Sequence, residues 1–69
     1  MVEIFKTAIE NEKQAELVIA LLKKHYAAYA ANFDLEDCDR ILRIEADRIP
    51  VNSVISLLKA EGFFVELLD

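Results

Sequence analysis

The chain has 69 residues, with thirteen acidic and eight basic side chains that give a net charge of −5 at neutral pH. Its length fits a single domain over residues 1–69, and 55% hydrophobic residues with one Gly and one Pro exclude a disordered tail or a flexible linker. The acidic balance also argues against a nucleic-acid partner, because the phosphate backbone would be repelled.

The first expected element is a strand from about Val2 to Ala8, whose alternation lets either Ile4 or Phe5 face a core. Asn11 followed by Gln14 is an Asn-led variant of the capping box, in which two side chains satisfy backbone donors of a first helical turn. A helix should then run from about Glu12 to His25. Its apolar positions recur at helical spacing and predict one buried face, made of Ala15, Val18, Ile19, Leu22 and Tyr26.

Two strands joined by a tight turn should follow. The segment AANFDLED, residues 30–37, alternates apolar and polar side chains, and RILRIEAD, residues 40–47, does the same. The residues EDCD, 36–39, predict a hairpin turn between them, because Asp favours turn geometry.

The last two expected elements are a helix and a strand. Pro50 suits the first turn of the helix, and Gly62 should end it in a left-handed conformation. The apolar face of this helix should comprise Val51, Val54, Ile55 and Leu58, and FFVELL, residues 63–68, should close the chain as a strand. The order βαββαβ predicts a ferredoxin-like α+β sandwich, with a four-stranded antiparallel sheet and two helices on one face.

Four segments resemble the heavy-metal-associated domain family of small copper-chaperone-like proteins: FKTAI at 5–9, NFDLED at 32–37, RILRIE at 40–45 and VISLLKAEGFFVELL at 54–68. In that family, a C-x-x-C pair after the first strand binds Cu(I) through two thiolates. The resemblance implies that these positions fall on Asn11 and Gln14, which supply no thiolate. We therefore interpret Asn11 and Gln14 as degenerate metal-loop positions that cap a helix, and we expect no cofactor.

Other metal ligands remain an alternative. The four acidic side chains near Cys38 in sequence are suited to a cation; they are Asp34, Glu36, Asp37 and Asp39. The segment lacks the Gly and the distant Glu of an EF-hand loop, so a solvated acidic turn is favoured. We expect Cys38 to be an unreactive surface thiol, and His25 to interact with the dipole at its helix end. The sequence has no Gly-rich phosphate loop and no convincing nucleophile–base pair, so we do not expect an enzyme.

The cellular location is predicted from the lone cysteine and the N-terminal segment. Cys38 has no intramolecular partner for a disulfide, and MVEIFKTAIE lacks the basic-then-apolar order of a secretory signal. The longest apolar run, LVIALL, is far shorter than the roughly 20 residues that a membrane-spanning helix needs. We expect a soluble cytoplasmic domain that does not associate with a membrane.

The candidate interaction surface is the sheet face that the two helices leave open. Alternation should point Ile41 to this face, and the adjacent Phe63 and Phe64 must point to opposite faces, which leaves Phe64 outside with Leu68. The first strand adds either Ile4 or Phe5, and we include Phe5. The chain is therefore interpreted as a binding module for a protein partner or a second copy, and the alternative is a metal-binding or metal-trafficking protein with ligands other than C-x-x-C.

Overall fold

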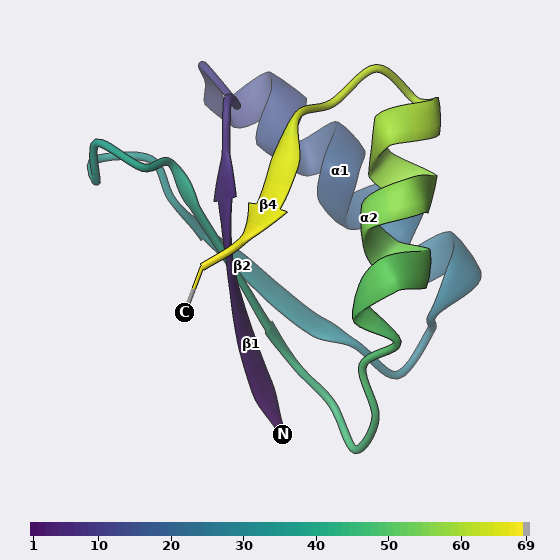
Figure 1. The fold of residues 1–69 in the computed structure, drawn as a ribbon. Helices are drawn as coiled ribbons and strands as arrows, with labels where there is room; N and C mark the ends of the chain where they lie inside the picture. The colour runs from purple at the N-terminus through teal and green to yellow at the C-terminus, as the bar shows by residue number, and fades with distance from the viewer. Residues whose placement is uncertain (69) are drawn as a thin grey trace.

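The computed structural model describes residues 1–68 and has the predicted ferredoxin-like α+β fold (Figure 1). The elements in chain order are β1 (Val2–Thr7), α1 (Glu12–His25), β2 (Ala30–Asp34), β3 (Ile41–Glu45), α2 (Val51–Ala60) and β4 (Val65–Leu67). The strands form one antiparallel sheet in the order β2-β3-β1-β4, and both helices lie on the same side of it. Within residues 1–68, neither helix has the length and apolar character needed to cross a membrane.

The orientation of β1 decides which side chains reach the core. This strand lies inside the sheet, where Phe5 is paired with Leu42 of β3 and with Leu67 of β4. The Phe5 side chain is 0% exposed, so its inclusion in the interaction surface was wrong. Cross-strand partners share a face, and Leu42 is fully buried, so Phe5 must point toward the helices with it. Ile4 points to the opposite face instead.

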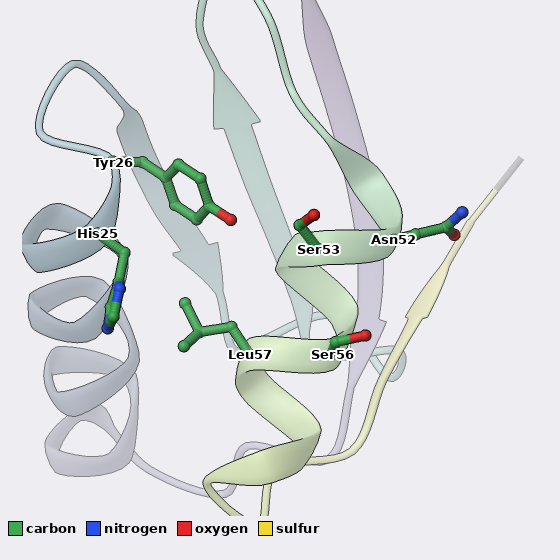
Figure 2. A pocket seen from close by; sticks show the side chains of 6 residues that line it. All are labelled: His25, Tyr26, Asn52, Ser53, Ser56 and Leu57. Atoms are coloured by element: carbon green, nitrogen blue, oxygen red, sulfur yellow. The ribbon is translucent and has the colours of Figure 1, made fainter.

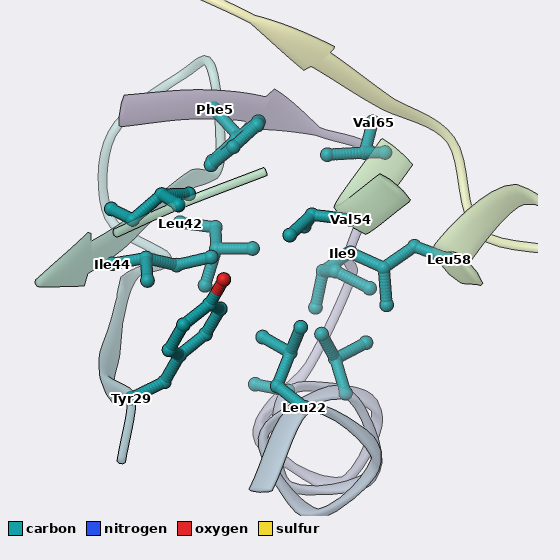
Figure 3. Close-up of a cluster of buried hydrophobic side chains, with 12 residues drawn as sticks. Phe5, Ile9, Leu22, Tyr29, Leu42, Ile44, Val54, Leu58 and Val65 are labelled. Atoms are coloured by element: carbon teal, nitrogen blue, oxygen red, sulfur yellow. The ribbon is translucent and has the colours of Figure 1, made fainter. Parts of the chain in front are cut away.

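The hydrophobic core fills the space between the sheet and the two helices (Figure 3). Every strand except β2 contributes at least one buried side chain, and each fully buried aliphatic or aromatic side chain stabilises the fold by roughly 1.5–3 kcal/mol relative to exposure. On the predicted helix faces, Ile19, Tyr26, Val51 and Ile55 are only partly buried. The core comprises Phe5, Ile9, Ala15, Val18, Leu22, Tyr29, Leu42, Ile44, Ile49, Val54, Leu58 and Val65.

The β2–β3 turn is longer than predicted, covering residues 35–40 instead of 36–39. Asp34 Oδ1 accepts a hydrogen bond from the Glu36 N–H at 3.3 Å, and Asp37 Oδ1 accepts one from the Asp39 N–H at 2.8 Å. Such bonds let an Asp side chain stabilise a turn in place of a strand ladder. Arg40 then adopts a positive φ of 48° just before β3 begins. The strands on both sides are correspondingly shorter than the alternation indicated.

The end of α2 is a Schellman motif. Gly62 has a φ of +88°, and its N–H donates to the Lys59 carbonyl at 3.0 Å. The Phe63 N–H donates to the Leu58 carbonyl at 2.9 Å, which completes the pair of bonds that defines the motif. The predicted role of Gly62 is therefore confirmed. At the other end, Pro50 occupies the N-cap position, one residue before the helix begins.

Tyr29 brings a polar group into the core. Its side chain is 7% exposed, and its ring stacks on that of Tyr26 with centroids 4.6 Å apart. The hydroxyl points into the hydrophobic cluster (Figure 3) and has no hydrogen-bond partner among residues 1–68. Burial, and to a lesser extent the neighbouring Tyr26, raises the pKa of Tyr29 above its ordinary value. A buried hydroxyl of this kind costs about 1–3 kcal/mol.

We predict that Tyr29→Phe raises the free energy of unfolding by about 1 kcal/mol at neutral pH, because it removes the unpaired hydroxyl and keeps the ring. The pKa of Tyr29 is higher in the folded state than in the unfolded state. Its neutral form therefore contributes to the free energy of unfolding below the ordinary pKa of about 10, and the unmodified protein loses this contribution as the pH rises through the folded-state pKa. Urea unfolding from pH 7 to 11 should show that the difference in free energy of unfolding between the variant and the unmodified protein grows at alkaline pH. Tyr26→Phe is the control, and a loss of stability in Tyr29→Phe would show that the hydroxyl has a partner.

Candidate functional site

The turn between β1 and α1 is a helix cap in the structure. Asn11 has an extended backbone, and its Oδ1 accepts a hydrogen bond from the Gln14 backbone N–H at 2.9 Å. Gln14 Oε1 accepts one from the Glu10 backbone N–H at 2.8 Å, one residue earlier than in a standard capping box. Asn11 and Gln14 therefore each use a side-chain oxygen to satisfy the backbone. The predicted capping role of Asn11 is confirmed.

Charges along α1 complement this cap. Glu12 lies in the first turn, and Lys23, Lys24 and His25 lie in the last. Acidic side chains near the start of a helix and basic ones near its end interact favourably with the helix dipole, typically by 0.3–1 kcal/mol each. The acidic Glu12 and the basic residues of the last turn thus contribute to the stability of α1.

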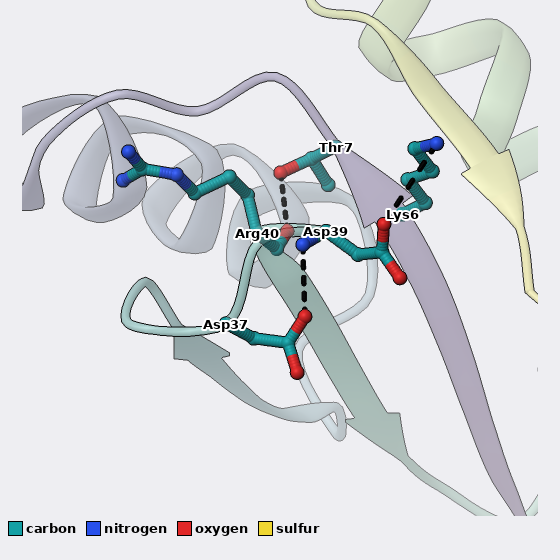
Figure 4. A network of polar contacts seen from close by, with 5 residues as sticks. All are labelled: Lys6, Thr7, Asp37, Asp39 and Arg40. Carbon is teal, nitrogen blue, oxygen red and sulfur yellow. Dashed lines mark hydrogen bonds and ion pairs between the residues drawn. The ribbon is translucent and has the colours of Figure 1, made fainter.

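A buried threonine joins the end of β1 to the β2–β3 turn (Figure 4). The Thr7 hydroxyl donates to the Arg40 carbonyl, and its oxygen accepts from the Ile9 N–H at 3.3 Å. The Thr7 backbone N–H also donates to the Asp39 carbonyl at 3.1 Å. The Thr7–Arg40 bond links residues 33 positions apart in sequence, so the alternation of a single strand did not indicate it. Thr7 therefore connects the acidic turn to the segment that precedes α1.

The acidic turn brings Asp37, Cys38 and Asp39 together, with their potential ligand atoms within 4.8 Å of one another. Asp34 and Glu36, which the sequence placed in the same group, are not part of this cluster. Asp37 is engaged with the Asp39 N–H, as described above, and the Asp39 carboxylate lies 3.8 Å from the Lys6 ammonium (Figure 4). Cys38 is exposed, as predicted. Both carboxylates therefore have structural roles in the turn.

A solvent-open hollow of about 540 Å³ lies between the end of α1 and the start of α2 (Figure 2). His25 lines it from α1, and Ser53 and Ser56 line it from α2. Figure 2 shows the Tyr26 hydroxyl directed toward α2 near Ser53. A nucleophile and its base must be within hydrogen-bond reach, and no hydrogen bond of residues 1–68 joins His25 to either serine. The structure does not bring a catalytic pair together here.

The sheet surface away from the helices, called here the open face, carries the remaining predicted residues. Phe64 is 49% exposed and Leu68 is 39% exposed, whereas Phe63 packs against the core. The Leu68 N–H donates to the Ile4 carbonyl at 2.9 Å, which places these two residues side by side. The outward positions of β1, β3 and the β4 segment are Val2, Ile4, Lys6, Ile41, Arg43, Glu45, Phe64, Glu66 and Leu68.

The residues predicted to lie on the open face do so with one exception. Phe64, Ile41 and Leu68 lie on the open face as expected, and Ile4 takes the place assigned to Phe5. Val2, 42% exposed, belongs to the same face and was missed, although it shares the alternation of Ile4.

Charged side chains alternate with these apolar groups along the strands. The Arg43 guanidinium lies 3.6 Å from the Glu45 carboxylate on β3, and Lys6 of β1 is directly opposite Glu66 of β4. Opposite charges in such cross-strand positions stabilise a sheet by roughly 0.2–1 kcal/mol. The open face therefore combines exposed apolar area with charges of both signs.

Comparison with models of known protein families and with curated proteins gives no match for this chain. The ferredoxin-like architecture rests on the structure itself, and membership of the heavy-metal-associated family stays a prediction.

We predict that Asn11→Ala lowers the free energy of unfolding by about 1 kcal/mol, because the α1 cap loses its acceptor. Asn52→Ala is a matched control, since Asn52 is exposed near the start of α2 and makes no side-chain hydrogen bond within the described chain. This control should change the free energy of unfolding by no more than about 0.5 kcal/mol. Urea denaturation measures both. If Asn11→Ala leaves stability unchanged and abolishes binding of a ligand, the turn is a binding site and not only a cap.

Proposed function

We propose that this chain is a cytoplasmic protein-interaction module that works through the open face of its sheet. The supporting observation is the exposure of Phe64 and Leu68 on a face that neither helix covers. An apolar patch that contains an aromatic ring and is rimmed by charges is typical of a protein-binding surface. Burial of the exposed part of Phe64 in a partner would contribute on the order of 1–2 kcal/mol.

Several exposed apolar side chains share this one face, whereas exposed hydrophobic residues are commonly scattered singly. Among the five large hydrophobic side chains most exposed in residues 1–68, three lie on the open face: Val2, Phe64 and Leu68. Ile4 and Ile41 add further partly exposed apolar area to it. Leu17, by contrast, is 58% exposed on α1 without belonging to this face.

The proposal treats the chain as a heavy-metal-associated-like domain that works through protein contacts instead of a thiolate pair. Its basis is the resemblance in sequence together with the use of Asn11 and Gln14 as a helix cap. The alternative is metal binding or trafficking through other ligands, for which Asp37, Cys38 and Asp39 are the nearest candidates.

A metal titration separates these two functions. We predict that the reduced protein binds neither Zn²⁺ nor Cu(I) at one equivalent in the presence of a competing chelator, because the turn offers one thiol and two carboxylates that already have partners. Sub-micromolar binding that Cys38→Ser abolishes would replace the interaction proposal with the metal-handling one.

Thiol labelling tests the interaction proposal directly. In a Cys38→Ser background, Leu68→Cys places a single thiol on the open face, and Leu17→Cys places one on α1 as the matched control. We predict that both thiols are labelled rapidly in dilute purified protein. In an extract of the cells that make the protein, labelling at position 68 should slow in proportion to the fraction of copies whose face is covered, and labelling at position 17 should not. Equal rates at position 68 in both settings would contradict the proposal.

A further inference from the structure

We infer that the outer edge of β2 binds an extended segment of a partner protein in which apolar and basic side chains alternate, and that this segment joins the sheet as a fifth strand. The inference goes beyond the proposed function, because it concerns the edge of the sheet and the hollow between β2 and α1, and not the open face. In complexes of this kind, main-chain hydrogen bonds provide affinity and side-chain pockets beside the edge provide specificity.

The outer edge of β2 has backbone groups to offer. β2 pairs only with β3, and residues 30–34 make no backbone hydrogen bond on the other side within residues 1–68. Alternate residues of an edge strand point their N–H and C=O groups outward, where another strand can pair with them. The opposite edge strand, β4, has only three residues, whereas β2 has five and contains neither Pro nor Lys to block strand addition.

The core is incomplete beside this edge. Phe33 is opposite the buried Leu42, so it points toward the helices, yet it is only partly buried. Leu35 and Ile19 are also only partly buried, and with Phe33 and Ala15 they line a hollow of about 420 Å³ between α1 and residues 33–36. Because β2 is the last strand on this side, an added strand would place its own apolar side chains against this hollow.

The charges around the hollow select a basic partner. Among residues 1–68, every charged side chain that lines it is acidic: Glu12 and Glu16, one turn apart on α1, and Asp34 and Glu36. All four are exposed, and none belongs to an ion pair within the described chain. Lys or Arg side chains of an added segment would pair with them. A second copy that paired through its own β2 edge would instead bring four more carboxylates to the same place.

Peptide binding tests the inference. The probe is the synthetic peptide KVKLKVK with both ends blocked, in which Val and Leu alternate with Lys. We predict that it binds at concentrations up to about 1 mM in dilute buffer, and that binding weakens as salt is added. Amide NMR shift changes should centre on residues 30–36 and on the side of α1 that carries Glu12 and Glu16. The charge-reversed peptide EVELEVE should not bind, and absence of binding by KVKLKVK would overturn the inference.

N-methylation separates strand addition from simple charge attraction. In an extended chain, successive N–H groups point to opposite edges, so the Val and Leu N–H groups lie on one edge of the peptide and those of Lys on the other. Only one edge can pair with β2. Of two peptides, one N-methylated at Val and Leu and the other at every Lys, one should therefore lose binding by about tenfold or more, and the other should retain it. Equal binding of the two would overturn strand addition.

Charge reversal on the protein locates the site. Glu16→Lys should weaken binding of KVKLKVK by about threefold or more. Glu61→Lys is the matched control, because it makes the same change of net charge at the end of α2, which packs beside β4 at the opposite edge of the sheet. Equal weakening by the two variants would overturn the site. Circular dichroism checks that Glu16→Lys is folded, and Glu36→Lys is the second variant if it is not.

The outcome is separable from that of the proposed function. Binding of KVKLKVK should leave thiol labelling of Leu68→Cys unchanged, because that position lies on the open face and not at the β2 edge. Failure of the peptide to bind would leave the open face as the proposed interaction surface. Slower labelling at position 68 in the presence of the peptide would place the peptide on the open face and overturn the inference.

Discussion

The burial of Phe5 beneath the helices fixes the direction of the side chains on the central strand of this sheet. Phe5 is paired on both sides, with Leu42 and with Leu67, so its inward orientation is shared by the neighbouring strands. A slip of one residue would place Phe5 outside and bring Ile4 and Lys6 beneath the helices, with the loss of about 2 kcal/mol or more of ring burial and the desolvation of an ammonium group. The core and the open face are therefore two consequences of one register.

The same architecture explains why the proposed function lies on the sheet and not on the turn after β1. Asn11, in the turn after β1, and Gln14, in the first turn of α1, carry amide side chains, and both amide oxygens accept hydrogen bonds from the backbone. The turn is further tied to the acidic hairpin through Thr7. Because both helices pack on one side of the sheet, the exposed Phe64 is left on the side that neither helix covers.

Local patterns in the sequence predicted the order of the elements, the bounds of α1 and the left-handed Gly62, because periodicity, capping and backbone conformation are properties of neighbouring residues. The choice between Ile4 and Phe5 was beyond such patterns, since both alternating sets of β1 contain apolar residues and only pairing with Leu42 decides between them. The burial of the Tyr29 hydroxyl, which has no hydrogen-bond partner within residues 1–68, likewise depends on contacts between distant segments. The candidate surface could thus be located from sequence, but its membership needed the register of the sheet.

The central claim is that a protein partner binds the open face, and amide NMR spectra of the isotope-labelled protein, recorded in dilute buffer and in an extract of the cells that make it, test this claim most directly. In the extract, the account predicts shift changes or selective line broadening at the outward positions of β1 and of residues 64–68, with little change along the exposed Leu17 side of α1. Identical spectra in both settings, or changes centred on the helices, would contradict it.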